Sequence, residues 1–140
     1  MDIDKMIKDA ILEKNGAKKE AYRAIKAELL LITTGKNAPS TIDEATEVKV
    51  IRKLISQREE SISMYEANSR QELADMYKEQ NKYLKELLPP EISKDDIKNA
   101  VYGLYPYGFS KKEIGKVIKS VKEIYPTADS KIIAKIINEN

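Results

Sequence analysis

Leu87-Leu88-Pro89-Pro90-Glu91-Ile92-Ser93 interrupts a chain that otherwise shows helical periodicity almost throughout. Two consecutive prolines remove two backbone donors and push the preceding residue out of the α region, so no helix continues through this point. Ser93 carries the side chain of a typical N-cap. The stretch therefore predicts that one helix ends, the chain turns and another helix begins. We place here a boundary between two helical domains, residues 1–88 and residues 89–140.

Apolar residues recur at helical spacing before this boundary and predict four helices. The predicted ranges are 2–14, 17–33, 43–67 and 69–87. The last two are long and are joined by a tight turn, which predicts an αα-hairpin with a shallow packing angle. The expected end signals are Gly16 as the C′ residue of the first helix, Thr41 or Asp43 as the cap of the third, and a capping box of Ser69 with Glu72 for the fourth.

Three shorter helical patterns follow the prolines, and Pro and Gly separate them. They begin at Ser93, at a capping box of Ser110 with Glu113, and at Asp129. Helices of this length are marginal alone, so they are expected to pack as a small bundle. No segment alternates with period two. The predicted fold class is therefore all-α: N-terminal helices with a long αα-hairpin, followed by a three-helix tail bundle.

Composition excludes several kinds of chemistry. The chain has no Cys and no His, which removes disulfides, thiolate nucleophiles and the commonest general base and metal ligand. No Gly-rich phosphate loop is present. We therefore expect no catalytic residues, no metal site and no cofactor. The N-terminus does not resemble a signal peptide and no apolar run is long enough to span a bilayer, so we expect a soluble cytoplasmic protein without a membrane partner.

The net charge of +2 comes entirely from residues 89–140, which contain nine Lys and seven acidic residues. Lys112, Lys116 and Lys119 follow at i, i+4, i+7 on the side opposite the apolar stripe, and Lys111 and Lys122 flank them. Such a face can contact phosphates in a salt-dependent way. An ordinary solvated helix face has the same spacing, so both interpretations remain open.

Aromatic residues lie near these lysines: Tyr105, Tyr107, Phe109 and Tyr125. They can stack on exposed bases, although packing beneath the loops is the commoner role. In the long hairpin, Arg58 falls in the apolar register of its helix. We interpret it as half of an ion pair between the two arms.

Several motifs in order resemble the YqeY family. The matching stretches are Tyr22–Leu29, Ile55–Tyr65, Arg70–Ala74, Tyr83–Ser93, Ile114–Ile118 and Ala128-Asp129. Together they span essentially the whole chain. Ser69 stands where the family usually has Gly, and Tyr125–Ser130 lacks the basic residue and both glycines that family tails often carry in this loop.

The YqeY family is similar to the C-terminal helical and tail domains of the B subunit (GatB) of the Asp/Glu-tRNA amidotransferase. The resemblance implies a tRNA-binding, amidotransferase-related accessory module without its own catalytic core. The alternative is a helical adaptor that binds a protein partner through the hairpin of residues 43–87. An amidotransferase acting alone is a weaker third hypothesis, because glutamine-dependent transfer needs an activated nucleophile.

Overall fold

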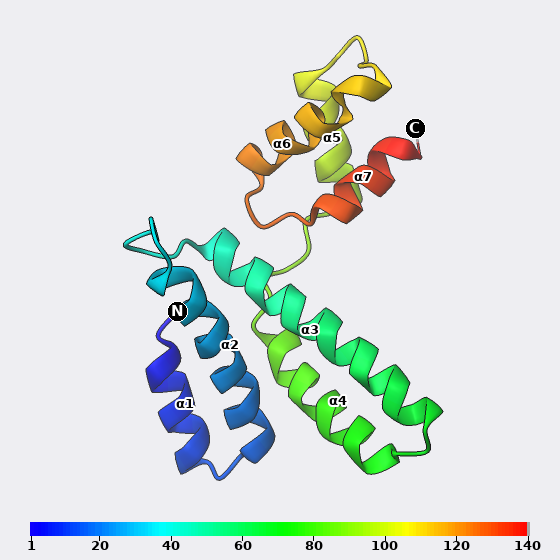
Figure 1. Cartoon of the computed structure of the whole chain (residues 1–140). Coiled ribbons are helices and arrows are strands. Elements are labelled where there is room, and N and C mark those ends of the chain that lie inside the picture. The colour runs from blue at the N-terminus through cyan, green and yellow to red at the C-terminus, as the bar shows by residue number, and fades with distance from the viewer. Residues whose placement is uncertain (140) are drawn as a thin grey trace. The chain divides into compact units, whose positions relative to one another are not determined.

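The fold is described from a computed structural model for residues 1–139. These residues form seven α-helices and one 3-10 helix without any strand, which confirms the predicted all-α class (Figure 1). The helices are α1 (Ile3–Leu12), α2 (Gly16–Thr34), α3 (Glu44–Ala67), α4 (Gln71–Glu86), α5 (Lys94–Leu104), η1 (Lys111–Glu113), α6 (Ile114–Ile124) and α7 (Ser130–Asn138). No helix in this part of the chain is both long and apolar enough to cross a membrane.

The chain divides into two compact units. Unit 1 is Met1–Leu88, and unit 2 begins at Pro89. Each unit has its own cluster of buried apolar side chains. Leu87 and Leu88 pack against the cluster of unit 1, whereas Ile92 packs against that of unit 2. The two prolines thus separate apolar residues that belong to different cores.

The core of unit 1 receives side chains from all four of its helices. In Figure 1, α1 lies beside α2, and α3 lies beside α4. Ala10, Ile25, Ile51 and Leu84, one from each helix, are almost completely buried. Burial of these side chains, and not helix propensity alone, holds such helices in place.

Two predicted helix ends in unit 1 are wrong in detail. Gly16 is the first residue of α2, and Asn15 is its N-cap, with its side chain accepting from the backbone N–H of Lys18 at 3.0 Å. The left-handed residue in that turn is Lys14, at φ 58°. An Asn beside the turn satisfies a free N–H of the following helix, and this gain decides where α2 begins.

The predicted capping box of Ser69 and Glu72 is also wrong. α4 follows Arg70 without a side-chain cap, and Ser69 lies in the left-handed region at φ 58°. Glycine adopts this conformation without steric cost, which gives a physical reason for a Gly at this turn. Of the two caps considered for α3, Asp43 is the correct one, because its carboxylate accepts from the N–H of Thr46 at 2.8 Å.

The two arms of the α3–α4 hairpin are joined by polar and aromatic contacts near its far end. The rings of Tyr65 and Tyr77 stack at 5.7 Å between centroids, with 5° between their planes. Nearer the core, Asn81 is buried and donates to the carbonyl of Ile55 at 3.2 Å. Its Oδ1 has no partner within residues 1–139. Such an atom costs about 1–3 kcal/mol.

Arg58 does join the two arms, but it forms no ion pair with any of residues 1–139. Its Nε donates to Oε1 of the buried Gln80 at 3.0 Å, and its guanidinium carbon lies 5.8 Å from the ring centroid of Tyr77. Burial lowers the pKa of the guanidinium, while the nearby Tyr77 and Glu20 act in the opposite direction. Arg remains charged at neutral pH. An amide oxygen and an aromatic face therefore replace the predicted carboxylate.

Unit 2 is a bundle of α5, α6 and α7 around a smaller core. Ile97, Val117, Val121 and Ile133 are almost fully buried in it. Ser93 caps α5 as predicted, accepting from the N–H of Asp96 at 3.0 Å. Lys94 and Glu139 pair at 2.6 Å, which joins the start of α5 to the residue after α7. The hydrogen bond from Lys94 lowers the pKa of the Glu139 carboxyl.

The helix after Ser110 begins differently from the prediction. Residues Lys111–Glu113 form one 3-10 turn, and the hydroxyl of Ser110 lies 3.3 Å from Oε1 of Glu113 without capping a backbone N–H. The regular helix α6 starts only at Ile114. Serine and glutamate here bond to each other through their side chains, so the expected reciprocal capping box does not form.

Candidate functional site

The row of lysines predicted from the sequence lies along η1 and α6. Lys111 and Lys112 belong to η1, and Lys116, Lys119 and Lys122 belong to α6. The opposite side of α6 is apolar, with Val117 and Val121 buried in the core of unit 2. The core contacts of these valines turn the row away from the bundle interior.

Four of the five lysines are exposed: Lys111, Lys112, Lys116 and Lys119. Within residues 1–139, none of these four takes part in an ion pair, whereas most pairs in the structure involve lysines of unit 1. We call Lys112, Lys116 and Lys119 the lysine row. Glu113 and Glu123 lie close in sequence to the row but form no ion pair with it within residues 1–139. Lysines that are not held in an ion pair attract external anions more strongly than paired lysines do.

Lys122 differs from the rest. It is half-buried, and its Nζ donates to the hydroxyl of Ser130 at 3.1 Å. This bond joins the end of α6 to the start of α7. Lys122 therefore has a structural role in the bundle. It is not available to bind a phosphate in the way that the four exposed lysines are.

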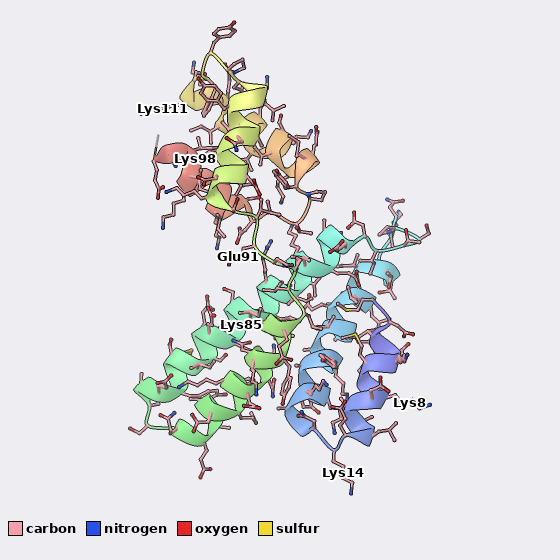
Figure 2. All side chains as sticks on the ribbon, turned by 180° about the vertical axis from the view of Figure 1, so that it is seen from behind. Lys8, Lys14, Lys85, Glu91, Lys98 and Lys111 are labelled. Atoms are coloured by element: carbon pink, nitrogen blue, oxygen red, sulfur yellow. The ribbon has the colours of Figure 1, made fainter. Side chains whose placement is uncertain are left out.

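A groove of about 640 Å³ lies in unit 2, close to Lys111. Its lining comes from α5, the segment that follows it, η1, α6 and α7: Lys98, Val101, Tyr102, Tyr105, Pro106, Gly108, Phe109, Lys111, Ile114, Ile136, Ile137 and Asn138. Two lysines and no carboxylates are among these residues. We call this cavity the aromatic groove. Figure 2 shows Lys98 and Lys111 on the same flank of unit 2.

The four aromatic residues considered from the sequence have different environments. Tyr105 and Phe109 line the aromatic groove and meet edge to face, with 5.7 Å between centroids. Tyr125 packs against the core of unit 2. Tyr107 is completely exposed and is not part of the groove lining. Only two of the four are therefore placed at a cavity.

Sequence reasoning missed Lys98 and Tyr102, which line the same groove. A signal for them was present, because Lys98 and Tyr102 follow at i, i+4 and so share one face of α5. Tyr102 is 72% exposed although it lines a cavity. An aromatic ring with this exposure offers much of its face to a ligand.

The acidic side chains of the described residues are spread over the surface. Within residues 1–139, no three Asp or Glu side chains gather closely enough to hold a metal ion. The acidic pairs lie at exposed positions of α3 and α5, such as Asp95 and Asp96 in the first turn of α5. Acids in a first turn are favourable because they face the positive end of the helix.

Comparisons with known proteins agree with the whole-chain pattern. The sequence model of the family described as "Yqey-like protein" matches residues 1–140. A curated protein of Candida glabrata, "Altered inheritance of mitochondria protein 41, mitochondrial", is 33% identical over 100 residues. The match covers 69% of this chain and 54% of that protein, so this chain matches about half the length of the relative.

Proposed function

Because the chain belongs to the YqeY-like family, we propose that it is a tRNA-binding, amidotransferase-related accessory module without a catalytic core of its own. The observation that carries this proposal is the lysine row, which is exposed on η1 and α6 and forms no ion pair with any of residues 1–139. The resemblance to the tail of the amidotransferase B subunit supports tRNA as the partner.

The proposed contact is electrostatic. Lys112, Lys116 and Lys119 bind backbone phosphates, and each neutralised phosphate releases condensed counterions. Binding of this kind weakens steeply as salt rises and reads no base sequence by itself. The module would thus hold an RNA without selecting it by sequence. A modest row of this size fits an accessory role better than stand-alone recognition.

The triple variant Lys112→Glu, Lys116→Glu and Lys119→Glu is expected to weaken tRNA binding by at least about tenfold, or about 1.4 kcal/mol. The reason is that three phosphate contacts become repulsive. Fluorescence anisotropy with labelled tRNA at about 50 mM and about 200 mM salt checks both the affinity and its salt dependence, which should become shallower in the variant.

The matched control places the same charge change in unit 1, as Lys8→Glu, Lys14→Glu and Lys49→Glu. These lysines are exposed and make no ion pair within residues 1–139. Lys8 and Lys14 lie in and just after α1 (Figure 2). The control should retain nearly all of the affinity. Equal losses in both variants would show a general charge effect, and unchanged affinity in the first would contradict the proposal.

A second candidate function is an adaptor that binds a protein through the α3–α4 hairpin. A groove of about 530 Å³ favours it, lined by Glu59, Ile62, Ser63, Lys78, Asn81, Lys82 and Lys85. Its lysines lie near carboxylates, as in the pair of Lys85 with Glu59 at 3.7 Å. A mixed-charge groove with an apolar residue suits a protein partner better than a polyanion.

If the chain is an adaptor, we expect a co-purifying protein to stay bound after nuclease treatment and at high salt. The variant Ile62→Asp, which changes the groove, should no longer bind this protein. A charge placed on an apolar contact is costly to desolvate. Quantitative mass spectrometry of affinity-purified complexes measures the retention, with Leu31→Asp as the control because Leu31 is exposed elsewhere on unit 1. Release of the partner by nuclease would contradict direct protein binding.

A further inference from the structure

The aromatic groove combines features that fit one unpaired nucleotide. Its walls include Tyr102, Tyr105 and Phe109, and its charged residues are Lys98 and Lys111. Aromatic faces stack on bases whatever their sequence, and lysines neutralise the phosphate attached to the same nucleotide. We propose that the aromatic groove takes one unstacked base of a single-stranded RNA segment, an inference that rests on the RNA binding proposed above.

The construction of the groove supports a stacking role. Tyr105 and Phe109 brace each other edge to face and also pack against the core, so their rings are held in place. Tyr102 is mostly exposed and is free to cover a base from the solvent side. The aliphatic side chains of Val101, Ile114 and Ile137 line the groove beside the rings, so this part of its wall is apolar. Stacking on rigid, partly dehydrated rings costs little ordering entropy.

Charge continuity favours RNA over an acidic protein segment. Lys111 lines the groove and is followed directly by Lys112, the first member of the lysine row. The groove lining holds no carboxylate, and within residues 1–139 neither Lys98 nor Lys111 forms an ion pair, since the nearby Glu139 pairs with Lys94 and feels Lys98 only at longer range. An RNA strand that contacts Lys112 can therefore place a neighbouring nucleotide at the groove, next to Lys111. A short acidic peptide would use the groove but has no need of the row.

The groove also predicts a preference for unpaired RNA over duplex RNA, which the lysine row alone does not predict. In a duplex, bases are stacked and paired, and removing one from the stack costs a few kcal/mol. A row of lysines binds phosphates, which both duplex and single-stranded RNA carry, so it does not distinguish between them. A base-accepting groove adds affinity only for single strands, loops and ends. Selectivity for unpaired RNA is therefore the signature of this site.

The test uses the whole chain, a labelled single strand of ten uridylates and a blunt RNA duplex of the same length. Uridylates stack weakly, so their bases are available. We expect tighter binding of the single strand. Tyr102→Ala should weaken single-strand binding about tenfold and leave duplex binding unchanged, since one stacked ring is lost. Tyr102→Phe should retain the affinity, because the ring face remains.

Tyr107→Ala is the matched control, because Tyr107 is fully exposed beside the groove but does not line it. It should bind like the unmodified chain. Thermal unfolding of each variant checks that the bundle stays folded, which the exposure of Tyr102 favours. Equal affinity for single strand and duplex, or equal affinities for Tyr102→Ala and Tyr107→Ala, would overturn the proposal.

Two further outcomes separate this inference from the function on which it rests. If the unmodified chain binds neither tRNA nor oligouridylate, both proposals fail. If the variant of the lysine row loses tRNA and Tyr102→Ala loses nothing, the groove proposal alone fails. Displacement of bound oligouridylate by a glutamate–tyrosine copolymer at lower concentration than by unlabelled oligouridylate would overturn it in favour of an acidic protein segment.

Discussion

Ile133→Ala is expected to unfold unit 2 while α1 to α4 stay folded. Ile133 is fully buried on α7, in the cluster that also holds Ile97, Val117 and Val121. Removing this side chain loses its transfer free energy and leaves a cavity, a cost of about 2–5 kcal/mol. A single core in a unit of this size rarely supplies more than about 3–5 kcal/mol. The loss is therefore comparable with the whole stability of the unit.

Amide hydrogen exchange resolved by residue measures this outcome. Protection should fall throughout α5, α6 and α7 and should persist in α1 to α4, because the two units have separate buried clusters. RNA binding should disappear with the fold of unit 2. Ile124→Ala is the matched control, since Ile124 is half exposed at the end of α6. Loss of protection in all helices at once would contradict independent cores.

Leu84→Ala is expected to destabilise unit 1 by about 2–5 kcal/mol without unfolding it completely. Leu84 is fully buried on α4, where it meets the cluster that includes Ile25 and Ile51. Unit 1 is larger than unit 2 and buries a larger fraction of its surface, so it retains more stability after the same loss. At about 4–8 °C per kcal/mol, the midpoint of thermal unfolding should fall by roughly 8–40 °C.

Chemical denaturation followed by circular dichroism gives the free energy of unfolding for this comparison. Leu31→Ala removes the same atoms from a side chain that is 70% exposed, and it should change that free energy by less than about 0.5 kcal/mol. Tight binding of oligouridylate should survive Leu84→Ala at low temperature, because the proposed groove lies in unit 2. A similar cost for both leucine variants would argue against the described core.

The five lysines show what sequence spacing alone can predict about this surface. Spacing identified five lysines near one helix, and four of them are exposed. It could not separate Lys122, whose partner Ser130 belongs to the next helix. It also could not assign Lys111 to a groove whose other walls come from α5 and α7. Both facts depend on how the three helices of unit 2 pack, which no local pattern encodes.

Arg58 shows the same limit in unit 1. Its apolar register correctly predicted that it faces the other arm of the hairpin. Its partner depends on the rotation of α4, which places Gln80 and Tyr77 opposite it. A charge in an apolar stripe requires a partner, but several residue types can provide one.

The stretch around Pro89-Pro90 illustrates what the sequence by itself determined. Missing donors, the restriction before proline and the cap at Ser93 act within a few residues, so the end of α4 and the start of α5 followed from local chemistry. Helical periodicity likewise predicted the seven α-helices of residues 1–139, although not every one of their ends. Only the tertiary structure decided which side chains meet at Arg58, at Ser130 and in the aromatic groove. Those contacts join residues distant in sequence, and close packing of whole helices selects them.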